Sequence, residues 1–238
     1  MKPGGDQDSM VPSPAPVRIP GLTRVKICGL TRIEDVQAAV AAGVDAIGFV
    51  FVPGTPRCVT VEWAALLRRG VPPFVTAVGL FVDVPVETVL STVESVRLDA
   101  VQLHGVEPPE LAAACMKRTR VIKAFRVRGR DTIAELERYR EVADAFLLDA
   151  FVPGAHGGTG ASFDWDLAVG ALAAGRPVIL AGGLNPDNVG EAVRRVRPFA
   201  VDVSSGVESA PGLKDAGRIR EFVAAANGRI PSGRIGEG

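Results

Sequence analysis

The sequence predicts a single-domain α/β protein, a closed (β/α)8 TIM barrel, and three observations lead to this fold class. Short apolar runs rich in Val, Ile, Leu and Phe recur eight times along the 238 residues. Most of them lack the alternation with polar residues that marks a half-exposed strand, which is typical of parallel strands buried on both faces. Segments with helical start signals separate the runs. Eight strand-then-helix units fit a barrel better than a doubly wound sheet, which more often has about five to seven strands.

The expected elements follow one another in regular order. Strands are predicted at 24–28, 45–51, 74–82, 98–103, 121–125, 144–150, 177–182 and 199–204. Capping patterns mark three helix starts: a capping box from Thr31 to Glu34, an N-cap at Asp131, and Asn185 as an N-cap before Pro186. The barrel domain is therefore expected to span residues 21–226.

The two ends of the chain differ in composition from the middle. Residues 1–20 and 227–238 contain many Pro, Gly and Ser residues and show no apolar periodicity, so they bury too little surface to offset the entropy of ordering. We expect both to be flexible tails. The first twenty residues carry Asp6, Asp8 and five prolines instead of a hydrophobic signal core, and no run reaches the about 18–20 apolar residues of a membrane span. The protein is therefore expected in the cytoplasm.

Charge and cysteine content exclude several classes of function. The chain has 27 basic and 27 acidic side chains and no run of Lys or Arg, which argues against nucleic acid or a membrane surface as partner, since both need a concentrated positive field. Cys28, Cys58 and Cys115 are widely spaced and form no CxxC pair, so neither a disulfide framework nor a zinc site is indicated. A small-molecule site is the expectation that remains.

Glycine-bearing loops follow the last two predicted strands. Gly182 and Gly183 come after the seventh strand, and Ser205 and Gly206 come after the eighth. Backbone N–H groups in such loops can donate to an anion, and this position in a barrel is a common phosphate site. The alternative is that the glycines only form tight turns.

Two residues at strand ends have the chemistry of proton transfer. Cys28 ends the first predicted strand, where a cysteine is often a small core residue. The helix expected after it and Lys26, two residues earlier on the same strand face, would favour its reactive thiolate. Asp149 ends the apolar run AFLLD, where partial burial would raise the pKa of its carboxyl and suit it to general acid catalysis, unless it only caps a loop.

Other polar residues gather at the same ends of the strands. Arg57 follows the second strand and can hold a carboxylate in a bidentate pair. Gln102 and His104 end the fourth strand, where a structural role explains the histidine equally well, and Asp202 in the eighth strand can orient its neighbours. His156 lies in a glycine-rich loop, and with no third ligand in sight no metal site is predicted.

These residues lie in motifs that together resemble the phosphoribosylanthranilate isomerase family of tryptophan biosynthesis. The similarity runs from about residue 25 to residue 222, and the order and spacing of the motifs make it specific. The motifs are VKICGLTR (25–32), GFVF (48–51) with TPR (55–57), VQLHG (101–105), LLDA (147–150), GGTG with FDW (157–165), LAGGLNPDNV (180–189), and VDVSSGVE (201–208) with GLKD (212–215).

The resemblance implies a barrel without metal or organic cofactor that performs an Amadori rearrangement. It implies that N-(5-phosphoribosyl)anthranilate becomes 1-(2-carboxyphenylamino)-1-deoxyribulose 5-phosphate, with Cys28 as general base and Asp149 as general acid. Arg57 would face the anthranilate carboxylate. The remaining positions are Gln102, His104 and Asp202 near the substrate, and Gly182, Gly183, Ser205 and Gly206 around the phosphate. Ala161 follows GGTG where the family commonly has lysine.

Two other functions stay open at this stage. One is a different phosphosugar isomerase or epimerase on the same barrel, although such enzymes usually use acidic or histidine pairs, whereas here the expected base is a cysteine. The other is a barrel that binds a phosphorylated metabolite without catalysis, which would need neither Cys28 nor Asp149. The sequence leaves open whether the protein is a monomer or a homodimer.

Overall fold

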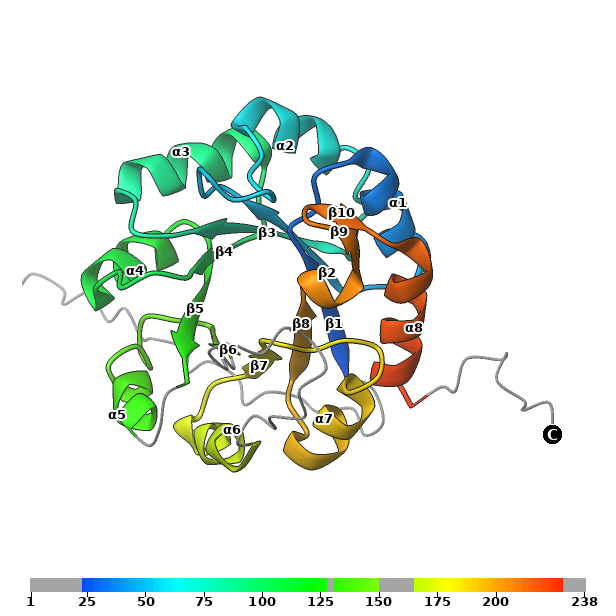
Figure 1. Ribbon diagram of the computed structural model, residues 1–238. Helices are drawn as coiled ribbons and strands as arrows, with labels where there is room; N and C mark the ends of the chain where they lie inside the picture. The colour runs from blue at the N-terminus through cyan, green and yellow to red at the C-terminus, as the bar shows by residue number, and fades with distance from the viewer. Residues whose placement is uncertain (1–22, 128–130, 150–164, 229–238) are drawn as a thin grey trace, which may run out of the picture.

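The barrel predicted from the apolar runs is present. The computed structural model describes residues 23–127, 131–149 and 165–228. In it eight parallel strands close into a barrel in chain order, surrounded by helices (Figure 1). The strands are β1 Arg24–Cys28, β2 Ala46–Val50, β3 Thr76–Phe81, β4 Ala100–Leu103, β5 Arg120–Arg126, β6 Ala145–Asp149, β7 Val178–Ala181 and β8 Ala200–Val203. The barrel closes where β1 pairs with β8, with Lys26 opposite Asp202.

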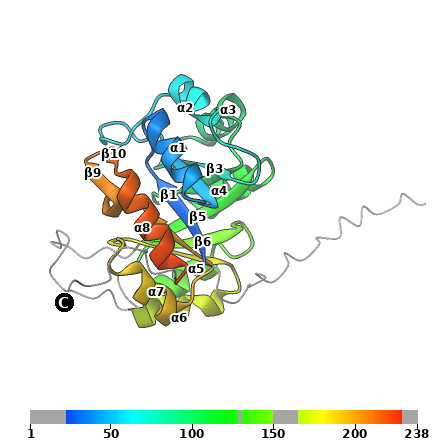
Figure 2. The same ribbon diagram turned by 90° about the vertical axis from the view of Figure 1, so that its right-hand side faces the viewer.

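One helix follows each strand except the last, where a small hairpin comes first. The helices are α1 Ile33–Ala41, α2 Val61–Arg68, α3 Val86–Val96, α4 Pro109–Met116, α5 Asp131–Glu137, α6 Trp165–Ala171, α7 Val189–Val196 and α8 Ala216–Ala226, with short 3-10 helices η1 Leu172–Ala174 and η2 Ser205–Val207. Strands β9 Glu208–Ala210 and β10 Leu213–Lys214 pair antiparallel between η2 and α8. Figure 2 shows this hairpin beyond the carboxyl end of β1. No helix in the described ranges is long and apolar enough to cross a membrane.

Both faces of the strands are buried, which explains why their sequences barely alternate. Successive side chains of a strand point to opposite faces. One set, which includes Ile27, Phe49 and Phe146, packs outward against the helices in the main apolar cluster. The other set points into the barrel and contains a smaller cluster of mostly small residues, Ala124, Ala145, Leu147, Ile179, Ala181 and Ala200. Polar groups share this inward face toward the carboxyl ends of the strands, and there they form the site described below.

Some predicted boundaries are wrong for identifiable reasons. The third strand begins at Thr76 rather than at residue 74, because Phe74 follows two prolines in a turn, has a φ of 72° and is fully exposed. The capping box at Thr31 is absent: its hydroxyl donates to the Gly212 carbonyl at 2.7 Å, and Arg32 caps α1 without a side-chain hydrogen bond. The hydroxyl that was expected to cap the helix instead forms this long-range hydrogen bond.

The other two predicted helix starts lie at, or a few residues before, the starts of observed helices. The Asn185 side chain caps a turn, accepting from the N–H groups of Asp187 and Asn188 at 2.9 and 3.2 Å, and α7 begins later, at Val189. Asp131 is the first residue of α5, but its side chain lies outside the described part. The predicted tail 1–20, residues 229–238 of the second tail, the GGTG motif, Ala161 and His156 also lie outside the described residues.

Candidate active site

A buried lysine lies at the centre of the polar groups inside the barrel. Lys26 on β1 donates from Nζ to Oε1 of Gln102 on β4 and to Oδ1 of Asp202 on β8, at 3.0 Å in each case. All three side chains are buried. Burial by itself lowers the pKa of Lys26, but Asp202 and Cys28 beside it together outweigh burial and raise the pKa above its ordinary value. The lysine therefore stays charged inside the barrel.

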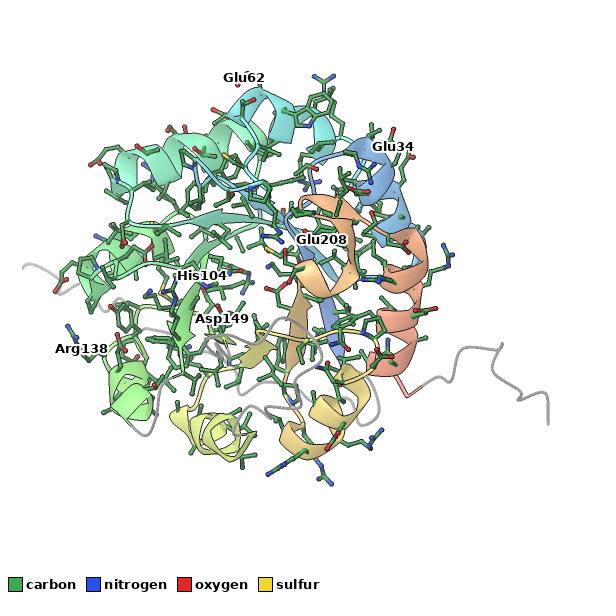
Figure 3. All side chains as sticks on the ribbon, viewed as in Figure 1. Glu34, Glu62, His104, Arg138, Asp149 and Glu208 are labelled. Atoms are coloured by element: carbon green, nitrogen blue, oxygen red, sulfur yellow. The ribbon has the colours of Figure 1, made fainter. Side chains whose placement is uncertain are left out.

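The same chain of contacts continues to the mouth of the barrel. Nε2 of Gln102 lies 2.7 Å from Nδ1 of His104, and Nε2 of His104 lies 3.3 Å from Oδ2 of Asp149 at the end of β6. His104 and Asp149 are both partly exposed, and Figure 3 shows them close together on the β4–β6 side of the barrel. The structure thus brings four of the predicted site residues, Gln102, His104, Asp149 and Asp202, into one hydrogen-bonded chain through Lys26.

Cys28 ends β1 two residues after Lys26 and points into the barrel. It is almost completely buried, and its carbonyl accepts from the Ser204 hydroxyl at 3.0 Å. Gly48 on β2 lies opposite Cys28, and a Cβ on this glycine would lie only 2.8 Å from Sγ. The missing side chain at position 48 is what makes room for the thiol.

Two opposing effects set the pKa of Cys28, and the sequence predicts only one of them. Burial raises the pKa of the Cys28 thiol above its ordinary value, and the ammonium groups of Lys26 and Lys214 oppose this only in part. Lys26 thus favours the thiolate, as the sequence predicts, but the cost of burying a charged sulfur exceeds the attraction of its cationic neighbours, so the net shift of the pKa is upward.

Arg57 does form a bidentate pair, but its partner belongs to this chain. Its Nε and Nη2 donate to the two carboxylate oxygens of Glu208 at 2.7 and 2.6 Å. Lys214 of β10 donates to the same carboxylate at 2.8 Å and to the Ser204 carbonyl at 3.0 Å. Although burial tends to raise the pKa of Glu208, its two cationic partners hold the pKa below its ordinary value. Within the described ranges Nη1 of Arg57 has no hydrogen-bond partner.

Sequence reasoning assigned no role to Glu208 or Lys214. Both lie on the β9–β10 hairpin, which folds back over the loops after β1 and β2. Gly212 at its turn accepts from Thr31 and lies so close to the Pro56 carbonyl that a Cβ there would overlap it. The only sequence pattern that could have pointed to Glu208 and Lys214 is the pair of motifs GVE and GLKD, whose charged residues interrupt short apolar stretches.

The two glycine loops after β7 and β8 lie against each other. Gly182 and Gly183 have φ angles of 83° and 65°, in the left-handed region that favours glycine. Gly206 packs against the Leu184 carbonyl so closely that a Cβ there would overlap it, and Ser205 begins η2. The predicted phosphate residues are thus gathered at one place, with their backbones close together.

A second buried ion pair supports the turn that carries His104. Lys123 of β5 donates to Glu107 at 2.9 Å and to the Gly105 carbonyl at 2.8 Å. Glu107 in turn accepts from the Gly105 N–H, and its carbonyl accepts from the Tyr139 hydroxyl at 2.8 Å. These bonds fix the backbone just after β4. No group of three or more potential ligands able to hold a metal ion occurs in the described part of the chain.

The chain is similar to known proteins of one family. A family model described as N-(5′-phosphoribosyl)anthranilate (PRA) isomerase matches residues 25–225. The N-(5′-phosphoribosyl)anthranilate isomerase of Geobacter sulfurreducens is 56% identical over 207 residues, which cover 87% of this chain and 100% of the relative.

Two solved structures share the whole barrel. A crystal structure of phosphoribosyl anthranilate isomerase in complex with reduced 1-(o-carboxyphenylamino)-1-deoxyribulose 5-phosphate has a TM-score of 0.79 and 43% identity, covering 87% of this chain and 100% of that one. A structure of monomers generated from the dimeric enzyme of Thermotoga maritima has a TM-score of 0.78 and 42% identity, with the same coverage. The chain therefore belongs to the N-(5′-phosphoribosyl)anthranilate isomerase family.

Proposed function

We propose that this enzyme converts N-(5-phosphoribosyl)anthranilate to 1-(2-carboxyphenylamino)-1-deoxyribulose 5-phosphate, an Amadori rearrangement of tryptophan biosynthesis. The observation that carries the proposal is the placement of Cys28 and Asp149 on the inward face of the same barrel mouth, at the carboxyl ends of β1 and β6. A barrel that only bound a phosphorylated metabolite would need neither a thiol nor a carboxyl group there.

The two groups divide the chemistry between them. Asp149 acts as general acid and protonates the ribose ring oxygen, so the ring opens to a Schiff base. Cys28 acts as general base and removes the C2′ proton, and the enolamine that forms tautomerises to the ketone. The reaction requires Asp149 to begin protonated and Cys28 to begin as the thiolate. Burial raises the pKa of Cys28, and the ammonium groups of Lys26 and Lys214 offset part of that rise, which lowers the cost of forming the thiolate.

Anchors at the two ends of the substrate supply the positioning. We assign the anthranilate carboxylate to Nη1 and the second N–H of Nη2 of Arg57, because Glu208 occupies only Nε and one N–H of Nη2. We assign the 5-phosphate to the loops of residues 182–183 and 205–206, where glycines without side chains let an anion approach the backbone N–H groups closely. His104 and Asp202 remain predicted substrate contacts, while Gln102 is fully buried behind His104.

The experiment is a fluorescence assay that follows consumption of freshly generated phosphoribosylanthranilate. Cys28→Ala and Asp149→Ala should each lower kcat by about 10²-fold or more, with a modest change in KM, because each removes one proton-transfer group. Cys58→Ala is the matched control, since that thiol is exposed and is expected to leave kcat unchanged. Turnover near that of the wild type in either catalytic variant would contradict the assigned roles.

A folded wild-type protein with no activity in this assay would favour the other two functions. A different phosphosugar isomerase would then interconvert another phosphorylated sugar. A binding barrel would bind phosphorylated metabolites without turnover. The cytoplasmic location stays a prediction based on the sequence.

We further propose that the protein is a homodimer rather than a monomer, as is the Thermotoga maritima relative. Phe74 supports this: it is fully exposed in the turn between α2 and β3, at a φ of 72° that a bulky residue rarely adopts. Burial of the ring against a second copy would offset both costs. Light scattering should give the dimer mass for the wild type and the monomer mass for Phe74→Ser. A monomeric wild type at assay concentrations would contradict the proposal.

A further inference from the structure

We propose that Lys26 and Gln102 are positioning residues that hold His104 in the tautomer with its proton on Nε2, so that His104 donates to Oδ2 of Asp149. The acid proton of Asp149 is thereby confined to Oδ1. This inference deepens the proposed function and rests on it for the role of Asp149 as the acid.

The Gln102 amide can take only one orientation. An ammonium group has three donors and no acceptor, so the atom of Gln102 that faces Lys26 Nζ at 3.0 Å has to be the oxygen. Both side chains are buried, and Asp202 holds Nζ in place from the other side, also at 3.0 Å. A flipped amide would place its NH2 group against an ammonium group in a site closed to water.

The orientation of Gln102 determines which nitrogen of His104 carries the proton. With Oε1 directed at Lys26, the NH2 group of Gln102 faces Nδ1 of His104 at 2.7 Å. An amide nitrogen can only donate, so Nδ1 has to accept. The neutral imidazole therefore carries its single proton on Nε2.

His104 in turn orients the carboxyl group of Asp149. Nε2 of His104 lies 3.3 Å from Oδ2 of Asp149. The torsion that rotates an aspartate carboxyl is broad, and a donor fixed on one oxygen selects one orientation. When Asp149 is protonated, the proton sits on Oδ1, since Oδ2 is already an acceptor. When that proton passes to the ribose ring oxygen, the carboxylate keeps the hydrogen bond from His104, which becomes charge-assisted.

Imidazole spectra of the protein without substrate give the decisive test. The chain has two histidines, His104 and His156, so 15N-detected imidazole spectra at alkaline pH contain few signals, and His156→Gln assigns them. We expect Nδ1 of His104 to show the shift of an unprotonated, pyridine-type nitrogen and Nε2 that of a protonated, pyrrole-type nitrogen. The reverse pattern, or an even mixture, would overturn the proposal. Because no substrate is needed, the result is independent of the proposed reaction.

A variant then links the tautomer to turnover. Gln102→Met keeps nearly the same volume and removes the amide, so the single tautomer should give way to a mixture. The loss of a hydrogen bond next to a charged group should lower kcat by about tenfold or more with little change in KM. Leu67→Met is the matched control, because it replaces another fully buried side chain, on α2, away from the site.

The outcomes separate the two proposals. A Gln102→Met protein with wild-type kcat, or one that keeps the Nε2–H tautomer, would refute the positioning role. The expected tautomer in a wild-type protein that does not consume phosphoribosylanthranilate would refute the proposed function and leave the geometry of the hydrogen-bonded chain intact.

Discussion

Gly48→Ala is the substitution that most directly tests the placement of the Cys28 thiol. Gly48 lies opposite Cys28 in the barrel wall. A Cβ at this position would lie 2.8 Å from Sγ, 3.1 Å from Cα and 3.3 Å from Cβ of Cys28. The sulfur would have to move by about 0.6 Å to reach the 3.4 Å at which ordinary contact begins. Rotation of the thiol is not enough to remove the overlap, because the backbone and Cβ of Cys28 are also too close.

The size of the effect follows from this displacement. A reacting group misplaced by about 1 Å can cost about 10²-fold in rate, so we expect kcat to fall by about 10- to 100-fold. Overpacking by one methyl group costs about 1–3 kcal/mol. In a domain of this size that corresponds to a fall in Tm of about 2–12 °C. The protein should therefore remain folded at 25 °C while losing most of its activity.

The assay compares kcat and Tm of Gly48→Ala with those of Gly190→Ala. Gly190 lies on α7, and a Cβ there would come no closer than 3.4 Å to a neighbouring carbonyl. The control should keep wild-type kcat. A Gly48→Ala protein with wild-type kcat would refute the reasoning, because it would mean that the position of the sulfur does not limit the reaction.

Three further predictions concern charges. Because burial raises the pKa of Cys28, its alkylation by iodoacetamide in a Cys58→Ser background should be slow at pH 7 and accelerate as the pH rises; equal rates at pH 7 and 9 would contradict this. Glu107→Gln leaves the buried Lys123 without a charged partner and should lower the free energy of unfolding by about 3–5 kcal/mol. Adding Lys123→Met should restore it, and urea denaturation measures the stability of both variants. The folded-state pKa of Glu208 is depressed below its ordinary 4.5, so the stability it provides is complete above pH 4.5 and is lost as the pH falls through the folded pKa. Glu208→Gln should therefore flatten the acid side of a Tm-against-pH profile, and an unchanged profile would count against the ion pair.

The fold was predictable because the barrel strands differ from their surroundings in composition. Runs such as VKIC and AFLLDA are apolar on both faces, and each was predicted within a few residues of its observed bounds. The errors come from contacts that no local pattern contains. Thr31 has a good capping sequence, yet its hydroxyl bonds to Gly212, which is 181 residues away in the chain. Phe74 looks like the start of a strand, but it follows two prolines and ends in a left-handed turn.

The residues of the site could be predicted from the sequence, but their ion pairs and pKa shifts could not. Position at the carboxyl ends of the strands, together with the family motifs, identified residues that the structure gathers at one mouth. The pairing of Arg57 with Glu208 joins residues 151 positions apart, and its third member, Lys214, lies on a hairpin of only five strand residues with no apolar period of its own. The pKa of Cys28 depends on a balance between burial and nearby charges, which only the three-dimensional structure shows.

The contacts between β1 and the last part of the chain have a consequence for synthesis on the ribosome. Lys26 is made early, but Asp202, which neutralises it, follows 176 residues later, and the carboxylate that pairs with Arg57 comes later still. A nascent chain that lacks β8 would hold an uncompensated ammonium group at the position of the barrel core, which is strongly unfavourable. Burial of β1 is therefore disfavoured until translation is nearly complete, and the growing chain must keep its first strand hydrated or held by another protein. Truncated chains that end before β8 should for the same reason be substrates for degradation rather than half-barrels.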